Sequence, residues 1–239
     1  MEGDIEELRR APNSFATLGL IEVVAHYEQI IRELETPPII VGHGFGGLVT
    51  QILLDRGWGA AGVAIASAPA KGVSWLPLSI LKPALSGVSN HKALSLTSEQ
   101  FHRGFANTSS EAQSLTFFNR YTVPGPTRVL WQAALANFLP SATTTVNFPN
   151  NTRAPLLFVS GGKDRVAPTS QVKANFERYR GSKAEIDYKE YPGQAHFTFL
   201  QETKVADYVL GWAVCRADSA STLAAFPNRK ASWSVQLSA

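Results

Sequence analysis

The sequence predicts an α/β fold in which helices cover both faces of a doubly wound, mostly parallel sheet, with a helical segment inserted between two strands. Three observations predict it. Short continuous apolar runs, as expected of buried parallel strands, end in glycine-containing turns. Helical stretches alternate with these runs along the chain. Residues 71–150 interrupt the alternation with several helical stretches that are separated by Pro and Gly.

The first third of the chain follows a regular order. Apolar residues recur at helical spacing across 18–35 with charged residues between them, and a Pro-Pro pair then stops this helix. Residues 39–41 (Ile-Ile-Val) predict a buried strand. A helix is expected over 47–56 and the next strand over 62–66.

The middle of the chain is predicted to be a helical cap, residues 71–150. Helical stretches are expected near 98–106, 109–121 and 127–138, and aromatic side chains are frequent there. Amphipathic helices inserted between two strands of one sheet are typical of a cap over a binding site.

Strand-helix alternation resumes after the cap. Strands are expected at 156–159 and 186–191, and helices at 170–180 and 203–215. Residues 1–70 and 151–216 are therefore predicted to form the core. Residues 217–239 are polar, rich in Ser and Ala and aperiodic, which predicts a loosely ordered tail.

The most informative motif lies where the first predicted strand meets its helix. Residues 42–46 read Gly-His-Gly-Phe-Gly, which matches the G-x-S-x-G pattern of a nucleophile elbow except at the serine. Gly44 stands at that position, and glycine has no side chain that can attack a substrate. Glycine also adopts the strained backbone of such a turn without steric cost. The motif therefore predicts the turn but not the covalent chemistry of the serine.

Two further candidates follow later strands. Asp164 comes after the strand at 156–159, within Ser-Gly-Gly-Lys-Asp-Arg-Val-Ala-Pro, and His196 comes after the strand at 186–191, within Tyr-Pro-Gly-Gln-Ala-His-Phe. Sites in open α/β sheets gather at the carboxyl ends of strands. With these motifs in the order nucleophile position, acid, histidine, residues 18–215 resemble the α/β-hydrolase family of esterases, lipases and small-molecule hydrolases.

The resemblance implies a role for each position. His196 would act as general base and acid, and Asp164 would hold its tautomer and stabilise the imidazolium. The backbone N–H of Phe45 would be one oxyanion donor. The substrate would be a small apolar or ester-like molecule, with no cofactor. Candidates for lining its site are three cap aromatics: Trp75, Phe105 and Trp131.

The N-terminal part of the chain departs from the family's pattern. The family has several strands before this turn, and a loop there supplies the second oxyanion donor. Here about 40 residues precede Gly42, and they predict one clear helix and no strand. The strand at 39–41 is therefore expected at an open edge of the sheet, a candidate surface for a partner chain or for self-association. The second donor is expected to be missing.

Composition and charge exclude several classes of function. The 239 residues carry a formal charge of +3 with dispersed basic residues, so no nucleic-acid partner is expected. No apolar run is long enough to span a membrane, and the charged start is not a signal peptide. The single cysteine, Cys215, is expected to be buried on a helix and suits a reducing compartment, which predicts a cytoplasmic protein. The histidine spacing predicts no metal site.

Three functions are compatible with a hydrolase motif that lacks its nucleophile, so the sequence leaves open whether the chain is an enzyme. The first is descent from a cofactor-free hydrolase of small esters or other carbonyl compounds, with serine catalysis lost or strongly reduced. The second is a general-base enzyme that uses His196 and Asp164 for elimination, cyclisation or proton transfer. The third is a non-catalytic pseudo-hydrolase that binds an apolar ligand.

Overall fold

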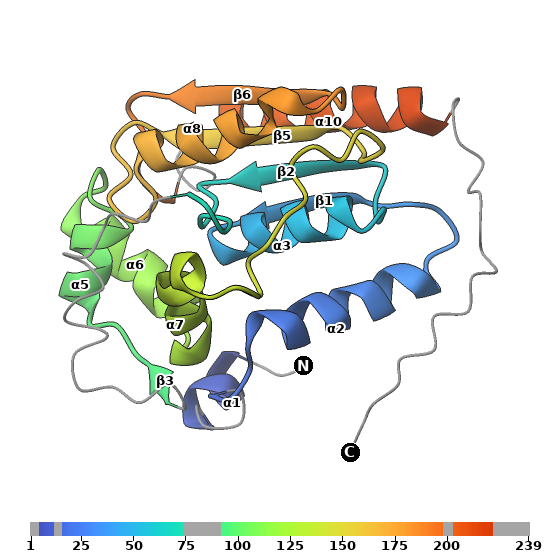
Figure 1. Ribbon diagram of the computed structural model, residues 1–239. Coiled ribbons are helices and arrows are strands. Elements are labelled where there is room, and N and C mark those ends of the chain that lie inside the picture. The colour runs from blue at the N-terminus through green and yellow to red at the C-terminus, as the bar shows by residue number, and fades with distance from the viewer. Residues whose placement is uncertain (1–4, 12–15, 74–91, 198–202, 222–239) are drawn as a thin grey trace, which may run out of the picture.

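The computed structural model describes residues 5–11, 16–73, 92–197 and 203–221, and in them the predicted α/β architecture is confirmed. Four parallel strands form one sheet in the order β1-β2-β5-β6 (Figure 1). The carboxyl ends of these strands therefore lie at the same end of the sheet. The strands are β1 (Ile39–His43), β2 (Ala61–Ile65), β5 (Leu156–Gly161) and β6 (Ile186–Tyr191).

Helices cover both faces of this sheet. α3 (Phe45–Asp55) packs on β1 and β2, and α8 (Thr169–Glu177) packs on β5 and β6 from the same side (Figure 1). α10 (Thr203–Ser221) packs on β2 and β1 from the opposite side. α2 (Leu20–Glu33) contacts α3 and lies beyond β1 in Figure 1, and the short α1 (Ile5–Arg10) precedes it.

The core lies between the sheet and these helices, but β1 is only partly enclosed. β2 and β5 are buried along their whole length, as parallel strands covered on both faces should be. β1 pairs only with β2 among the described residues, and Val41 is 48% exposed. Helices α1 and α2, and no described strand, precede β1. The open edge expected at 39–41 is therefore present in the described part of the chain.

The segment between β2 and β5 is mainly helical, as the aromatic-rich stretches predict. Thr97 and Ser110 each begin a helix, because their side chains accept hydrogen bonds from the backbone N–H of Gln100 and Gln113. The predicted division into a core and a cap over 71–150 stays a prediction. The elements are α5 (Ser98–Gly104), α6 (Glu111–Tyr121), α7 (Thr127–Leu135), a 3₁₀ turn (Ala136–Phe138) and the antiparallel pair β3 (Ala93–Leu94) and β4 (Gly125–Pro126).

Two features of the last helix correct the expectations from sequence. α10 continues to Ser221 instead of ending near residue 215, because the alanines and serines there continue a helix that no Gly or Pro ends. Cys215 is exposed rather than buried. The buried face of α10 includes Val205, Val209 and Ala213 at a spacing of four residues, and Cys215 lies off that face.

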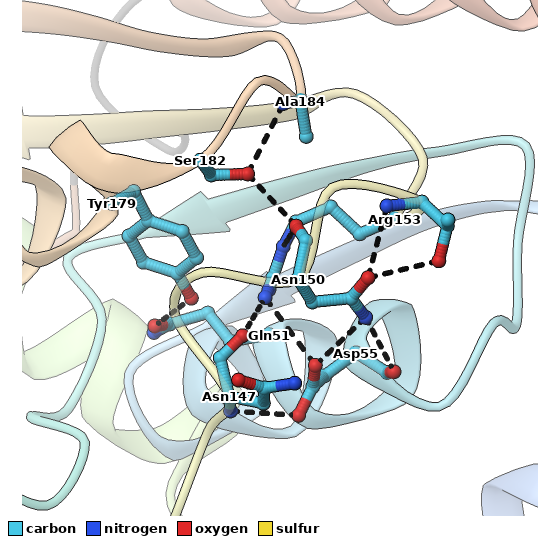
Figure 2. A network of polar contacts seen from close by, with 9 residues as sticks. Gln51, Asp55, Asn147, Asn150, Arg153, Tyr179, Ser182 and Ala184 are labelled. Carbon is cyan, nitrogen blue, oxygen red and sulfur yellow. Dashed lines mark hydrogen bonds and ion pairs between the residues drawn. The ribbon is translucent and has the colours of Figure 1, made fainter.

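A buried polar network holds the far end of α3 (Figure 2). The hydroxyl of Tyr179 donates to Oε1 of Gln51 at 2.9 Å, and burial raises the pKa of Tyr179 above its usual range. Arg153 has a fully buried side chain, which lies over the Tyr179 ring and pairs with Asp55 at 3.3 Å. Because α3 begins directly after Gly44, this network also helps to fix the position of the turn at its other end.

Candidate active site

The three sequence candidates meet at the carboxyl ends of the strands. Gly44 follows β1, Asp164 follows β5 and His196 follows β6. The two side chains are buried, and Nδ1 of His196 lies 2.7 Å from Oδ2 of Asp164. Since a carboxylate can only accept, Nδ1 carries the hydrogen. Nε2 is then the basic nitrogen of the imidazole.

The Asp164 carboxylate is held at both oxygens. Its Oδ1 accepts hydrogen bonds from the backbone N–H groups of Val166 at 2.7 Å and Ala167 at 2.8 Å. Its Oδ2 accepts from His196. These bonds fix the plane of the carboxylate, so it can hold the imidazole in one orientation and one tautomer.

Gly44 occupies a backbone conformation that favours glycine, with φ of 59° and ψ of −120°. Its N–H donates to the carbonyl of Ile65 at 2.9 Å, and its own carbonyl accepts from the N–H of Ala68 at 2.8 Å. A Cβ built on Gly44 would lie 3.5 Å from Nε2 of His196, and the His196 ring would be its only neighbour within 4 Å among described residues outside residues 43–45. A hydroxyl on that carbon would reach hydrogen-bonding distance of Nε2.

Gly42 allows the close approach of strand and helix at this turn. A Cβ on Gly42 would overlap the carbonyl of Gly46 and lie 2.5 Å from Oγ1 of Thr50, so the strand and the helix approach too closely for any side chain. Phe45 is the first residue of α3. The first N–H groups of a helix have no carbonyl partner one turn earlier. The N–H of Phe45 is therefore suited to binding a negatively charged oxygen.

His43 also contacts the histidine of this site. Its Nε2 donates to the backbone carbonyl of His196 at 2.8 Å, and the two ring centroids are 4.3 Å apart. Burial, and next the nearby His196 ring, lower the pKa of His43 to about 3, against the opposing effect of its backbone hydrogen bond. His43 is therefore neutral at pH 7.

One of the predicted cap aromatics lies against His196. The Phe105 ring is edge-on to the imidazole, with centroids 5.1 Å apart. Phe197, which sequence reasoning missed because only its place after His196 marks it, packs edge-on at 6.5 Å from Phe105 and stacks on Phe117 at 6.1 Å. His196 thus borders a cluster of aromatic rings from the end of α5, from α6 and from the loop after β6.

The other two predicted aromatics are not placed at His196. Trp131 lies partly buried on α7, and its indole Nε1 is buried without a hydrogen-bond partner among the described residues. No ring contact within the described ranges joins Trp131 to His196. Trp75 lies outside the described residues.

Two further observations concern metal-binding groups and membrane-spanning helices, neither of which the sequence predicted. Within the described residues, no group of three or more His, Cys, Asp or Glu side chains is arranged to hold a metal ion. None of the described helices combines the length and the apolar character that crossing a bilayer requires.

The comparisons with known proteins agree with this fold. Residues 8–208 match a model described as the alpha/beta hydrolase family. The structure resembles the monoacylglycerol lipase of Paleococcus ferrophilus, with 19% identity, a TM-score of 0.59 and coverage of 84% of this chain and 77% of that chain. It also resembles the methylesterase MES16 from Arabidopsis, with 14% identity, a TM-score of 0.56 and coverage of 83% and 80%. At these identities the likeness to solved structures shows the fold alone.

The search of curated proteins found no match. The family model spans most of the chain and includes Gly44, Asp164 and His196. The chain therefore belongs to the alpha/beta hydrolase family.

Proposed function

We propose that this protein is a hydrolase-family member that takes small ester-like or related carbonyl compounds and does not form an acyl-enzyme. The supporting observation is the 3.5 Å between Nε2 of His196 and the place of the missing Cβ of Gly44. His196 and Asp164 are paired at 2.7 Å, and residue 44 has no side chain that could attack a substrate. Enzymes that lose one triad member keep on the order of 10³–10⁴-fold catalysis over water when the oxyanion hole and the binding site remain.

The expected substrate class rests on the surroundings of His196. Phe105 lies against His196, and Phe197 and Phe117 extend the aromatic cluster from Phe105. Such rings favour apolar groups on the bound molecule. Phe45 would supply one oxyanion donor through its backbone N–H. The proposal includes a cytoplasmic location, because a single cysteine forms no internal disulfide and suits a reducing compartment.

The completeness of the His196–Asp164 pair supports a second function, general-base catalysis without a protein nucleophile. Nε2 of His196 would take a proton from a water or a substrate hydroxyl standing where a Gly44 side chain would be. For an ester, the water oxygen would attack the carbonyl carbon as His196 takes its proton. His196 would then return that proton to the leaving alkoxide. Elimination, cyclisation or proton transfer would use the same base.

The decisive experiment restores the nucleophile. Gly44→Ser is expected to react covalently with a fluorophosphonate probe, giving one adduct on the peptide that carries the substitution by mass spectrometry, whereas the unmodified chain and Gly44→Ala remain unlabelled. Replacing His196 by Ala in the Gly44→Ser background should slow labelling by roughly 10²–10⁴-fold, because the base is lost. Labelling of the unmodified chain at the same rate as Gly44→Ser would refute the proposal, since another nucleophile would then serve.

The second function is tested on the unmodified chain. If general-base catalysis operates, hydrolysis of p-nitrophenyl butyrate should exceed the rate in buffer and should fall by roughly 10²–10⁴-fold in His196→Ala. Equal rates in the two proteins would exclude this function for that ester class. Stabilisation by the ester without turnover, measured by thermal shift, would instead support the non-catalytic binding protein.

A further inference from the structure

The open edge of β1 is a candidate binding surface, separate from the candidate active site. We propose that it binds the chain's own C-terminal segment, residues 232–238, as an added strand parallel to β1. This inference does not depend on the catalytic proposal, because it concerns the edge of the sheet rather than the Gly44 turn.

The backbone of β1 is oriented to accept another strand. The carbonyl of Pro38 accepts from the N–H of Ala60, and the N–H of Gly44 donates to the carbonyl of Ile65. The backbone N–H and C=O groups of successive residues point to opposite edges of a strand. Those of the even-numbered residues of β1 therefore point toward β2, and those of the odd-numbered residues point toward the open edge. The amides of Ile39 and Val41 therefore point away from the sheet. An exposed edge with this arrangement is a template for pairing.

The helix that lies beyond this edge carries exposed apolar side chains. Tyr27, Ile30 and Leu34 on and just after α2 are each more than 40% exposed, and Val41 on β1 is 48% exposed. The first three recur at i, i+3 and i+7, so they lie on one face of the helix. α2 lies beyond the free edge of β1 (Figure 1). A strand added to β1 would bring one of its faces toward these side chains.

The C-terminal sequence has the pattern that such a strand needs. Although the 217–239 tail is aperiodic as a whole, residues 232–238 read Ser-Trp-Ser-Val-Gln-Leu-Ser, with strict alternation of polar and apolar residues. A strand of this sequence presents Trp233, Val235 and Leu237 on one face and small polar side chains on the other. The apolar face would cover the exposed stripe of α2. These residues lie outside the described part of the chain.

The length of the connecting residues 222–231 and the charges before β1 favour a parallel orientation of the added strand. α10 packs on β2 and β1 and runs back toward the N-terminal ends of the strands (Figure 1). The ten residues 222–231 can span up to roughly 33 Å, whereas neighbouring strands are about 4.8 Å apart. The segment would thus enter at the start of β1. There Arg229 and Lys230 would lie near the exposed Glu33 and Glu35, which precede β1.

Hydrogen exchange followed by NMR tests this pairing residue by residue. In the full chain the amides of Ile39 and Val41 should exchange at least about tenfold more slowly than in a chain truncated after Ser221, because pairing protects them. The amides of Ile40 and Gly42 already face β2 and serve as internal controls with unchanged rates. Equal exchange of Val41 in the two chains would overturn the proposal.

A substitution within the full chain covers the case in which the truncated chain does not fold. Val235→Pro removes a backbone donor and should release the protection of Val41, whereas Ala225→Pro in the connecting residues should preserve it. Protection in the full chain should be independent of protein concentration, with a monomer in sedimentation. Protection that rises with concentration together with a dimer would overturn the intramolecular pairing, because the segment would then come from a second copy.

Discussion

Acidification should destabilise this protein through His43 before its carboxylates are protonated. The pKa of His43 is about 3 in the folded chain, whereas an exposed histidine has a pKa near 6.5. Between these values the unfolded chain binds up to one more proton than the folded chain does at this residue. The stability contributed by neutral His43 is therefore complete above pH 6.5 and is lost progressively as the pH falls toward 3.

The magnitude follows from the size of the interval. Each pH unit below 6.5 costs up to about 1.4 kcal/mol, so a change from pH 7.5 to pH 5 should lower the free energy of unfolding by about 2 kcal/mol through this residue. The physical cause is that a charged His43 would be buried next to the His196 ring, 4.3 Å away between centroids. Protonation there would place a charge where contact with water is reduced.

His43→Gln is the matched variant, because its amide can still donate to the backbone carbonyl of His196 but does not titrate. Urea denaturation of both proteins at pH 7.5, 6 and 5 gives the difference in their stabilities, in which contributions from other titrating groups largely cancel. That difference should shift by about 2 kcal/mol in favour of the variant between pH 7.5 and 5. A shift below about 0.5 kcal/mol would show that His43 is not desolvated in the folded protein and would refute the reasoning.

Two further predictions concern stability at pH 7. Gly44→Ala should lower the free energy of unfolding by about 1–3 kcal/mol, because its φ of 59° and ψ of −120° are unfavourable for any side chain. Gly181→Ala is the control, because a Cβ at Gly181 meets nothing within 4 Å. An equal loss of stability in the two variants would show that the backbone of Gly44 is not strained. Arg153→Ala should cost about 3–5 kcal/mol by leaving Asp55 without its buried partner. Removing the exposed Arg103 should cost less than about 0.5 kcal/mol, and equal costs in urea unfolding would contradict this ranking.

The sequence could predict the turn at Gly44 because its glycines are marked by a local steric requirement. Gly42 is needed where the strand and the helix nearly touch, and Gly44 fits the positive φ that follows it. Asp164 and His196 could be predicted to meet because parallel strands bring their carboxyl ends to one end of the sheet. These inferences needed only the order of strands and turns, which periodicity and glycine placement indicate.

The remaining features depend on packing between distant segments. The bond from His43 to the carbonyl of His196 joins residues 153 positions apart, and neither local sequence indicates it. Phe197 joins Phe105 and Phe117 only once the loop after β6 reaches helices α5 and α6. The end of α10 could not be located because the residues after 215 neither favour nor prohibit a helix strongly.

The structure also explains why the fold can persist without its nucleophile. The turn is held by the backbone bonds of Gly44 to Ile65 and Ala68 and by the close approach at Gly42, none of which involves a residue 44 side chain. The orientation of His196 is set by Asp164 and by the backbone bond from His43, again without a hydroxyl. A serine here would add strain of about 1–3 kcal/mol and no packing contact beyond the His196 ring. Folding therefore favours glycine at this position, whereas acyl transfer requires the hydroxyl. Gly44→Ser should lower the stability of the fold while it supplies that hydroxyl.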